Sequence, residues 1–340
     1  MGLASYVVDA IIREHAYKAI SGDVLLIGRQ TVYMTPQEAI ETVRSHGLTP
    51  AIDAKDIVLD RDTVNRRPGW ADREMISDAS LFALLGNTKV KALDHTSYEG
   101  AEVVHDLTTE VPPHLRGCAD FIVDGSTLDN TFNPALTLKN YADLLRPGGR
   151  LFAINTFSNH FDPYVIPSPL WYLDYFVMNR FADCKVYVMV HMPESVNAFC
   201  INPECLLDPR REVRNFVAPY ELATIIIAEK AANSTTTVWP TQAHYRSDND
   251  WSIYRGNLAE MTQSRRPHIL RSVGEMRYFD VIGGYLFVDQ HHMARDPSTE
   301  ESRVRASSVE TAQPPTLIGR AKQLVLRLVH TAGYDVVKVR

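Results

Sequence analysis

The fold class of this chain follows from residues 118–155, which read CADFIVDGSTLDNTFNPALTLKNYADLLRPGGRLFAIN. The apolar run 121–123 is typical of a strand that is buried on both faces. Apolar residues at three- and four-residue steps then predict a helix, which ends at the Pro-Gly-Gly of residues 147–149 because proline cannot continue a helix. The apolar run 151–154 predicts a second strand. The stretch therefore indicates one right-handed strand–helix–strand unit.

The rest of the chain alternates helices and strands around this unit. Helices are predicted over residues 3–20, 35–46, 77–86 and 168–178, each from apolar periodicity and most from a hydroxyl cap or a terminal glycine. Strands are predicted over residues 24–28, 90–94, 99–107, 185–190 and 221–230. This alternation favours an α/β fold with a doubly wound, mostly parallel sheet.

The pattern D-F-I-V-D-G-S-T-L, followed by L-L-R-P-G-G-R-L, resembles the fourth and fifth strands of class I S-adenosylmethionine-dependent methyltransferases. The resemblance covers residues 21–232. It implies a Rossmann-like sheet of seven strands, closed by antiparallel sixth and seventh strands, with S-adenosylmethionine as the cofactor. It also implies methyl transfer to an acceptor held at the carboxyl ends of the strands.

The loop after the first strand departs from that family. Methyltransferases usually have a G-x-G-x-G loop there, which lets the backbone approach the methionine part of the cofactor. Here the loop is Gly28-Arg29-Gln30-Thr31-Val32, and only the first glycine is present. Two interpretations stay open. Either Gly28 only turns the chain and the cofactor site has decayed, or Arg29 or Gln30 takes over polar contacts, with Arg29 pairing with the cofactor carboxylate.

Acidic residues follow the next two predicted strands. Asp94 ends residues 90–94, where Rossmann-like folds hold ribose hydroxyls on a carboxylate. By resemblance, Asp106 faces the adenine amino group, Leu107 packs on the adenine ring, and His95 lines the same pocket. The full set of expected cofactor-binding residues is Gly28, Arg29, Gln30, Asp94, His95, Asp106, Leu107, Asp124 and Gly125.

The loop that leaves the strand 151–154 is expected to hold the acceptor. His160 is the natural general base, since its unperturbed pKa lies near neutrality, although a structural role for this histidine stays open. Asp124 is the second expected catalytic residue. The loop resembles that of a bacterial methyltransferase-like group linked with surface-glycan biosynthesis, through Asn159-His160 and Ser168-Pro169. The expected substrate-binding residues are Ser126, Asn155, Asn159 and Tyr164.

Three functions are therefore considered. The first is S-adenosylmethionine-dependent methyl transfer to a small-molecule or glycan acceptor, at an oxygen nucleophile. The second is a binding or scaffold protein that keeps the fold without transfer, which the missing glycines favour. The third is a nucleotide-cofactor oxidoreductase, against which the absence of G-x-G-x-x-G counts more heavily.

Composition limits the partners and the compartment. The 340 residues carry a net charge of −6, which argues against broad binding to nucleic acid. The four cysteines form no Cys-x-x-Cys pair, and the adjacent histidines His291 and His292 point opposite ways on a strand, so no metal site is expected. The N-terminus matches neither a signal peptide nor a spanning helix, and a cytoplasmic location is expected.

Five segments are expected along the chain. They are an N-terminal helix (1–20), the methyltransferase-like domain (21–232, with an insertion at 48–75), an extension that covers the core (233–293), a mobile linker (294–316) and a basic amphipathic tail (317–340). Residues 317–330 are expected to dock on the core, to contact a second subunit or to touch an anionic membrane surface.

Overall fold

The computed structural model describes residues 2–60, 73–158, 162–192, 195–201, 221–262 and 277–279. The chain divides into two compact units after Ala294, and all the described residues belong to the first unit. Five expectations concern sequence outside the described residues. These are the role of Asn159, the role of His160, the interpretation of the 291–292 histidines, the segment 294–316 and the segment 317–340.

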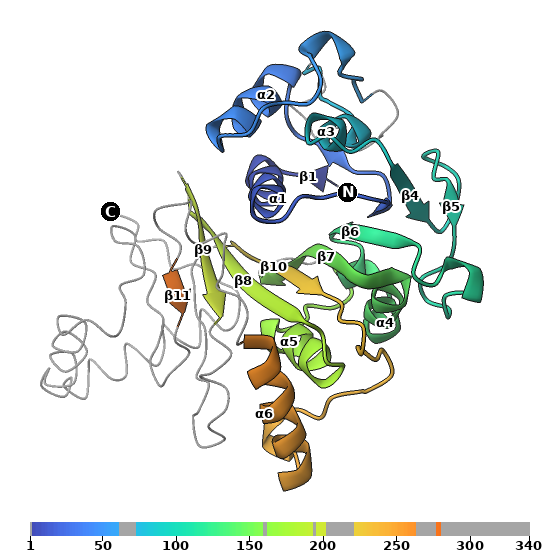
Figure 1. Ribbon diagram of the computed structural model, residues 1–340, viewed down its shortest axis with the longest axis vertical. Helices are drawn as coiled ribbons and strands as arrows, with labels where there is room; N and C mark the ends of the chain where they lie inside the picture. The colour runs from blue at the N-terminus through green and yellow to red at the C-terminus, as the bar shows by residue number, and fades with distance from the viewer. Residues whose placement is uncertain are drawn as a thin grey trace, which may run out of the picture. The chain divides into compact units, whose positions relative to one another are not determined.

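A sheet of nine strands forms the centre of the described residues, in the order β11-β9-β8-β10-β7-β6-β2-β4-β5 (Figure 1). Its strands are β2 (Val24–Ile27), β4 (Val90–Asp94), β5 (Val103–Val104), β6 (Ala119–Gly125), β7 (Leu145–Ser158), β8 (Asp183–Met192), β9 (Ser195–Ile201), β10 (Glu221–Glu229) and β11 (Arg277–Phe279). Five neighbouring strands of the sheet, β5, β4, β2, β6 and β7, pair in parallel. This is the expected α/β, Rossmann-like, mostly parallel sheet of the class I methyltransferase type, extended by β9 and β11.

The end of the sheet differs from the expectation in one respect. Strand β10 pairs antiparallel with both β7 and β8. Strand β8 therefore runs in the same direction as β7, and only the last of the seven expected strands is reversed. Strand β10 lies between two strands that precede it in the sequence, a placement that apolar patterns cannot indicate because they do not encode strand neighbours.

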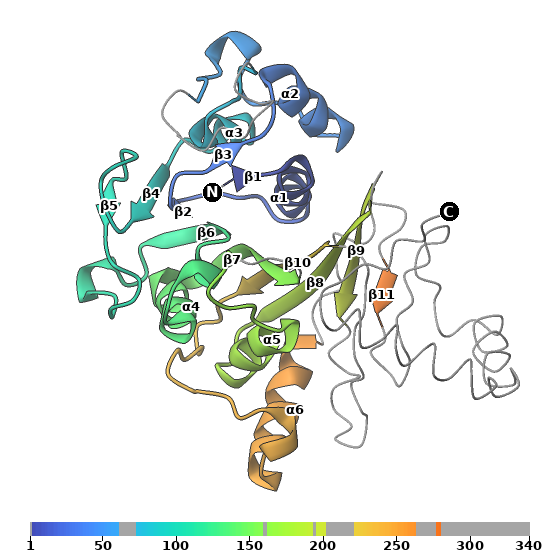
Figure 2. The same ribbon diagram turned by 180° about the vertical axis from the view of Figure 1, so that it is seen from behind.

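Helices cover both faces of the sheet (Figures 1 and 2). The helices are α1 (Ser5–Tyr17), α2 (Pro36–Ser45), α3 (Asp78–Leu84), α4 (Pro134–Leu144), α5 (Pro169–Met178) and α6 (Asp248–Thr262). One apolar cluster holds buried side chains of α1, α2 and α3, and the other those of α4, α5 and α6. The predicted doubly wound architecture is therefore confirmed. No helix within the described residues is both long and apolar enough to cross a membrane.

Local sequence signals set several helix ends as expected. Helix α2 begins at a capping box, in which the Thr35 side chain accepts from the Glu38 N–H and Glu38 reaches back to the Thr35 N–H. It ends at Ser45, two residues before Gly47, which has a φ of +71°. Helix α4 ends earlier than expected, at Leu144, and Pro147 lies within β7 rather than between helix and strand.

Other segments are shorter or differently placed than the sequence indicated. The expected strand 99–107 is reduced to two residues in β5. Leu59, within the expected insertion 48–75, forms a single bridge to Ile76. The N-terminal helix starts at Ser5 because Gly2–Leu3 form β1, which pairs in parallel with β3 (Thr31–Val32). This small second sheet ties the N-terminus to the loop after β2, a contact between distant residues that no local pattern predicts.

The described part of the C-terminal extension packs on the core, next to α5. Arg246 precedes α6, and its Nη2 lies 2.5 Å from Asp174 Oδ2 on α5. The same guanidinium stacks 4.0 Å from the centre of the Tyr254 ring. Because the side chain of Arg246 is only 2% exposed, this pair anchors α6 by both charge and packing.

Candidate functional site

Five parallel strands direct their carboxyl ends to one edge of the sheet, and most of the expected site residues lie there. Gly28 follows β2, Asp94 ends β4 and Asp106 lies two residues after β5. Gly125 ends β6, and Asn155 lies within β7. Ligands of open α/β sheets bind at this edge, because strand ends and the following loops converge there.

Asp94 and Asp106 form the first part of the site. Gly28 has a φ of +72°, and a Cβ at this position would lie 3.4 Å from Asp94 Oδ2, so the Asp94 carboxylate lies over the glycine. The His105 N–H donates to the Asp94 carbonyl (2.9 Å), which holds the two strand ends together. Asp106 is 39% exposed, and its Oδ2 lies 4.0 Å from His95 Nδ1. The structure thus brings two accessible carboxylates together at adjacent strand ends.

The electrostatics of Asp106 favour its ionised form. Its carboxylate accepts from the hydroxyl of Thr108 (2.7 Å) and from the N–H of the same residue (2.8 Å). These hydrogen bonds, with a smaller effect of His95, lower the pKa of Asp106 below its ordinary value. Leu107, by contrast, is only 7% exposed and packs in the core, so it offers little surface on which a ring can pack.

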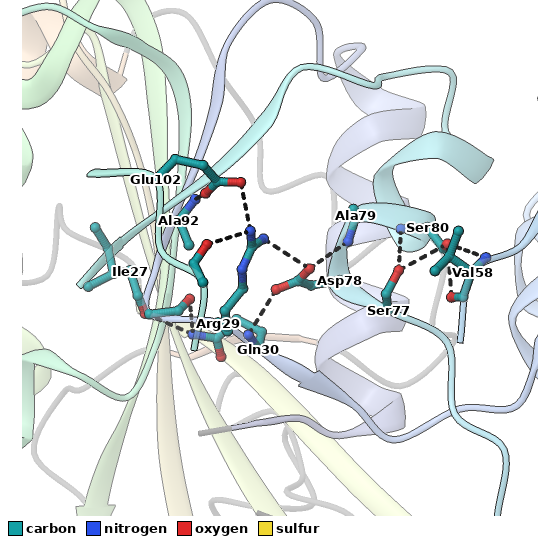
Figure 3. Close-up of polar contacts among 12 residues, drawn as sticks. Ile27, Arg29, Gln30, Val58, Ser77, Asp78, Ala79, Ser80, Ala92 and Glu102 are labelled. Carbon is teal, nitrogen blue, oxygen red and sulfur yellow. Dashed lines mark hydrogen bonds and ion pairs between the residues drawn. The ribbon is translucent and has the colours of Figure 1, made fainter. Parts of the chain in front are cut away.

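Arg29 contacts acidic side chains of the protein itself (Figure 3). Its Nη2 donates to Glu102 Oε1 (2.7 Å) and to the Gly100 carbonyl (3.3 Å), and its Nη1 lies 3.4 Å from Asp78 Oδ1. Glu102 Oε2 in turn accepts from the N–H of Ala92 on β4. The network fixes the loop after β2 to α3 and to the segment before β5. In this arrangement the charge of Arg29 is already balanced.

Asp78 is the buried centre of this network, and the sequence reading assigned it only to a helix start. Its Oδ2 accepts from the Gln30 N–H (3.0 Å), and its Oδ1 accepts from the Ala79 N–H at the start of α3. Burial raises the pKa of Asp78 more than these hydrogen bonds and the nearby Arg29 lower it. The only signal in the sequence that marks Asp78 is its place as an acid in the first turn of a predicted helix.

Gln30 fills the space between the carboxyl ends of β2 and β6. Its side chain is fully buried, and Nε2 donates to the carbonyls of Ile27 (2.8 Å) and Gly28 (3.2 Å). Its Oε1 would lie 2.0 Å from a Cβ placed on Gly125, so only glycine fits opposite it. This buried Oε1 has no hydrogen-bond partner.

Asp124 is fully buried just before the end of β6. Its oxygens accept from the N–H groups of Thr127 (2.6 Å) and Leu128 (3.3 Å), which closes the turn into the following 3-10 helix. Burial raises the pKa of Asp124 to about 7; the charge of Asp129 also raises it, and the bond from Thr127 opposes this. The carboxyl group therefore supports the loop that carries Ser126 and Asp129.

Asp129 joins β6 to β7, and sequence reasoning missed it. It is fully buried and accepts from the Ser126 hydroxyl (2.8 Å) and from the Thr156 N–H (2.9 Å). Its own N–H donates to Asn155 Oδ1 (3.3 Å), and its carbonyl accepts from Val165 N–H (3.1 Å). The spacing Ser-x-x-Asp at residues 126–129 is the local signal that indicates such a turn.

Two exposed aromatic rings stand on the loops beyond β6 and β7. Phe132 and Tyr164 are 87% and 71% exposed, with ring centres 6.0 Å apart in an edge-to-face arrangement. The hydrogen bond from Val165 to Asp129 holds the second loop against the first. Tyr164 was an expected substrate residue, whereas Phe132 was not, because a single exposed phenylalanine in a loop has no pattern to mark it.

Two cavities among the described residues lie away from this edge of the sheet. One of about 450 Å³ is lined by α2 and the segment after it, including Ile40, Arg44 and Ile52. Another of about 430 Å³ lies between α2 and the residues near Tyr33. Neither is lined by an expected site residue.

Comparison with known proteins finds no matching family profile and no matching curated protein. Among solved structures, the chain is similar to the citrinin polyketide synthase CMeT domain at 13% identity, over 45% of this chain and 42% of that one, with a TM-score of 0.31. It is similar to the trans-methyltransferase CalH in complex with SAH at 14% identity, over 66% and 55% of the chains, with a TM-score of 0.31.

A third similarity is to a zinc-dependent alcohol dehydrogenase from Rhodobacter sphaeroides, at 14% identity over 45% and 46% of the chains, with a TM-score of 0.23. The chain thus spans about half the length of these solved structures, between 42 and 55%. Because all three TM-scores are below 0.5, the fold class rests on the strand order of this chain itself.

Proposed function

We propose that this chain is an S-adenosylmethionine-dependent methyltransferase that acts on an oxygen of a small-molecule or glycan acceptor. One observation carries the proposal: Asp94 and Asp106 present accessible carboxylates at adjacent strand ends, beside the positive-φ Gly28. A carboxylate accepts both hydrogen bonds of a ribose diol, and a second acid one strand further accepts from an exocyclic amine. The edge therefore suits an adenosine.

The residues present fit the two halves of the cofactor unequally. The nucleoside half has Asp94 and Asp106, while the methionine half meets Gln30, whose side chain fills the space next to Gly125. Arg29, the expected partner of the cofactor carboxylate, already contacts Glu102 and Asp78. When bound, the cofactor supplies an electrophilic methyl group on a sulfonium. The chain binds it, orients the acceptor and excludes water.

The acceptor side of the proposal rests on the loops after β6 and β7. An exposed aromatic ring packs on the apolar face of a sugar or of another flat ring, and Phe132 and Tyr164 offer two such rings. Of the other expected substrate residues, Ser126 donates its hydroxyl to Asp129, and Asn155 is 1% exposed and accepts from the Asp129 N–H, so Asn155 supports the loop from below. Removal of the acceptor proton by His160 stays a prediction. Asp124, buried beneath the loop, supports the site without reaching an acceptor.

The test is calorimetric titration of the purified protein with S-adenosylmethionine and S-adenosylhomocysteine. We expect micromolar binding that is lost in Asp94→Ala, because the ribose hydroxyls lose their acceptor. Asp53→Ala is the matched control, since that carboxylate is exposed and lies just before the 3-10 helix Ala54–Asp56, outside the expected site residues. Absence of binding to either nucleoside by the folded wild-type protein would refute the proposal.

A binding protein without transferase activity is the second candidate function. The ion pairs of Arg29 and the buried Gln30 side chain favour it, because both occupy the loop that should contact the methionine half. Nucleoside binding without any methyl transfer to sugar or phenolic acceptors would support this alternative. The oxidoreductase alternative is tested in the same titration with NAD, which we expect not to bind.

The proposal includes a cytoplasmic location. Cys118, Cys184 and Cys200 are free thiols, and the last two are buried. Free thiols are usual in reducing compartments. The proposed partners are a small molecule or glycan and no nucleic acid. For residues 317–330, contact with a second subunit or a membrane surface stays a prediction.

A further inference from the structure

The order of the strands fixes the direction in which an adenosine derivative must extend. Asp106 follows β5, Asp94 ends β4, and the next two strands along the edge are β2 and β6. A ligand with its base near Asp106 and its ribose on Asp94 therefore carries any group on the ribose 5′ carbon past Gly28 and towards Gly125. The Gln30 side chain lies at that place.

Gln30 is held there by specific contacts. Its Nε2 donates to the carbonyls of Ile27 (2.8 Å) and Gly28 (3.2 Å), and its own N–H is fixed by Asp78 (3.0 Å). The Ile27 carbonyl also accepts from the Thr127 hydroxyl (3.2 Å). If the Gln30 amide moves away, Ile27 therefore keeps a hydrogen-bond partner, and the main chain of the loop stays anchored to Asp78.

The carbonyl oxygen of the same side chain is unsatisfied. Gln30 Oε1 is buried against Gly125 without a hydrogen-bond donor, and Asn155 Nδ2, on the neighbouring β7, is also buried without an acceptor. An unpaired buried polar atom raises the free energy of the conformation that buries it. The unpaired Oε1 thus offsets part of the stabilisation that the two Nε2 hydrogen bonds provide, which lowers the free energy needed to displace the side chain.

We propose that Gln30 is a gate on the amino-acid half of the proposed cofactor site. The inference rests on the proposed function. With the gate closed, the edge binds adenosine through Asp94 and Asp106 and excludes a bulky group on the 5′ carbon. The gate explains why this loop has glutamine where a glycine is usual.

The experiment compares adenosine with S-adenosylhomocysteine, which differ by the amino-acid end, in calorimetric titrations. In the wild-type protein we expect similar dissociation constants for the two ligands, within about threefold, because opening the gate offsets the added contacts. In Gln30→Ala we expect S-adenosylhomocysteine to bind about tenfold or more tightly than in the wild type, with adenosine unchanged. Gln37→Ala, an exposed glutamine on α2, is the matched control.

The outcomes separate the gate from the proposed function. If neither ligand binds to the folded wild-type protein, the proposed function is refuted and the gate with it. If adenosine binds but the ratio of the two dissociation constants is the same in wild type and Gln30→Ala, only the gate is refuted. Should Gln30→Ala not fold, the wild-type ratio still decides, since S-adenosylhomocysteine binding more than tenfold tighter than adenosine contradicts a closed gate.

Discussion

At the scale of single residues, the two buried acids Asp124, near the end of β6, and Asp129, in the segment after it, have different tasks. Asp129 accepts hydrogen bonds from Ser126 and Thr156 and so joins two strand ends. Asp124 closes a turn through Thr127 and Leu128 and has its pKa raised to about 7 by burial. A buried carboxyl group whose pKa lies near neutrality makes the stability of the fold depend on pH.

We expect Asp124→Asn to remove part of that pH dependence. Between the ordinary value of 3.8 and about 7, the folded protein holds a proton on Asp124 that the unfolded chain has released. The stability from this group is therefore full below pH 4 and is lost as the pH rises through about 7. Urea unfolding of the wild type should show a free energy of unfolding that falls between pH 5 and pH 7.5, by up to a few kcal/mol.

The variant should show a smaller fall over the same range, because an amide does not ionise. Asp53→Asn, at an exposed position, is the control and should follow the wild type. Equal pH dependence in Asp124→Asn and the wild type would show that this carboxyl group is ionised in the folded protein throughout.

Ser126 offers a second test at this scale. It has a φ of +78°, in the left-handed region that a side chain with a Cβ rarely adopts, and its hydroxyl donates to Asp129. Ser126→Ala and Ser126→Gly both lose the hydroxyl, but only glycine relieves the backbone strain. We expect the glycine variant to be more stable than the alanine variant by about 1 kcal/mol in urea unfolding. Equal stabilities would mean that the backbone turns away from this φ in solution.

At the scale of elements, a buried ion pair attaches α1 to the sheet. Arg150 on β7 pairs with Glu14 on α1, and the two residues are 5% and 1% exposed. The guanidinium also donates to the carbonyls of Lys18 and Ala19 just after the helix (2.9 Å each). Burial, with the charge of Arg150, lowers the pKa of the neighbouring His15, so this histidine stays neutral beside the pair.

Removing one member of this pair should be costly. We expect Arg150→Met to lower the free energy of unfolding by about 3–5 kcal/mol, because the buried Glu14 carboxylate loses its ion pair with Arg150. The double variant Arg150→Met, Glu14→Leu should lose less than the sum of the two single changes. The control is Arg73→Met, whose side chain and that of its partner Glu38 are 36% and 45% exposed, with an expected loss below about 1 kcal/mol. Additive losses at Arg150 and Glu14 would contradict direct coupling.

Most helices and strands were predicted from the sequence. The caps at Thr35, Ser77 and Ser168 and the apolar runs of β2, β6 and β7 gave the right helices and strands, because both signals act over a few neighbouring residues. Element ends were less well predicted. Helix α4 gives way to β7 before Pro147, since pairing of Leu145 with Ala119 extends the strand beyond what its sequence suggests.

At the scale of the whole molecule, the sheet arranges residues that are distant in the sequence. Strand order places Asp94, Asp106, Gly28 and Gly125 along one edge, although they span almost a hundred positions. The same order inserts β10 between β7 and β8, which an alternation of elements along the chain cannot specify. Three acids that the sequence did not mark lie at the site only because of this arrangement. Asp78 and Glu102 contact the loop after β2, and Asp129 accepts a hydrogen bond from Thr156 on β7.

The amino-acid sequence alone determined the fold class, the helix caps and the strand-end acids Asp94 and Asp106, because periodicity, capping and terminal residues are local properties. Tertiary structure decided the rest. It paired Arg29 with Glu102 and Asp78, buried Leu107 in the core, and set the Gln30 amide against Gly125. These outcomes depend on burial and on charges brought together from separate strands, so the same loop sequence was compatible with either a bound or a closed cofactor site.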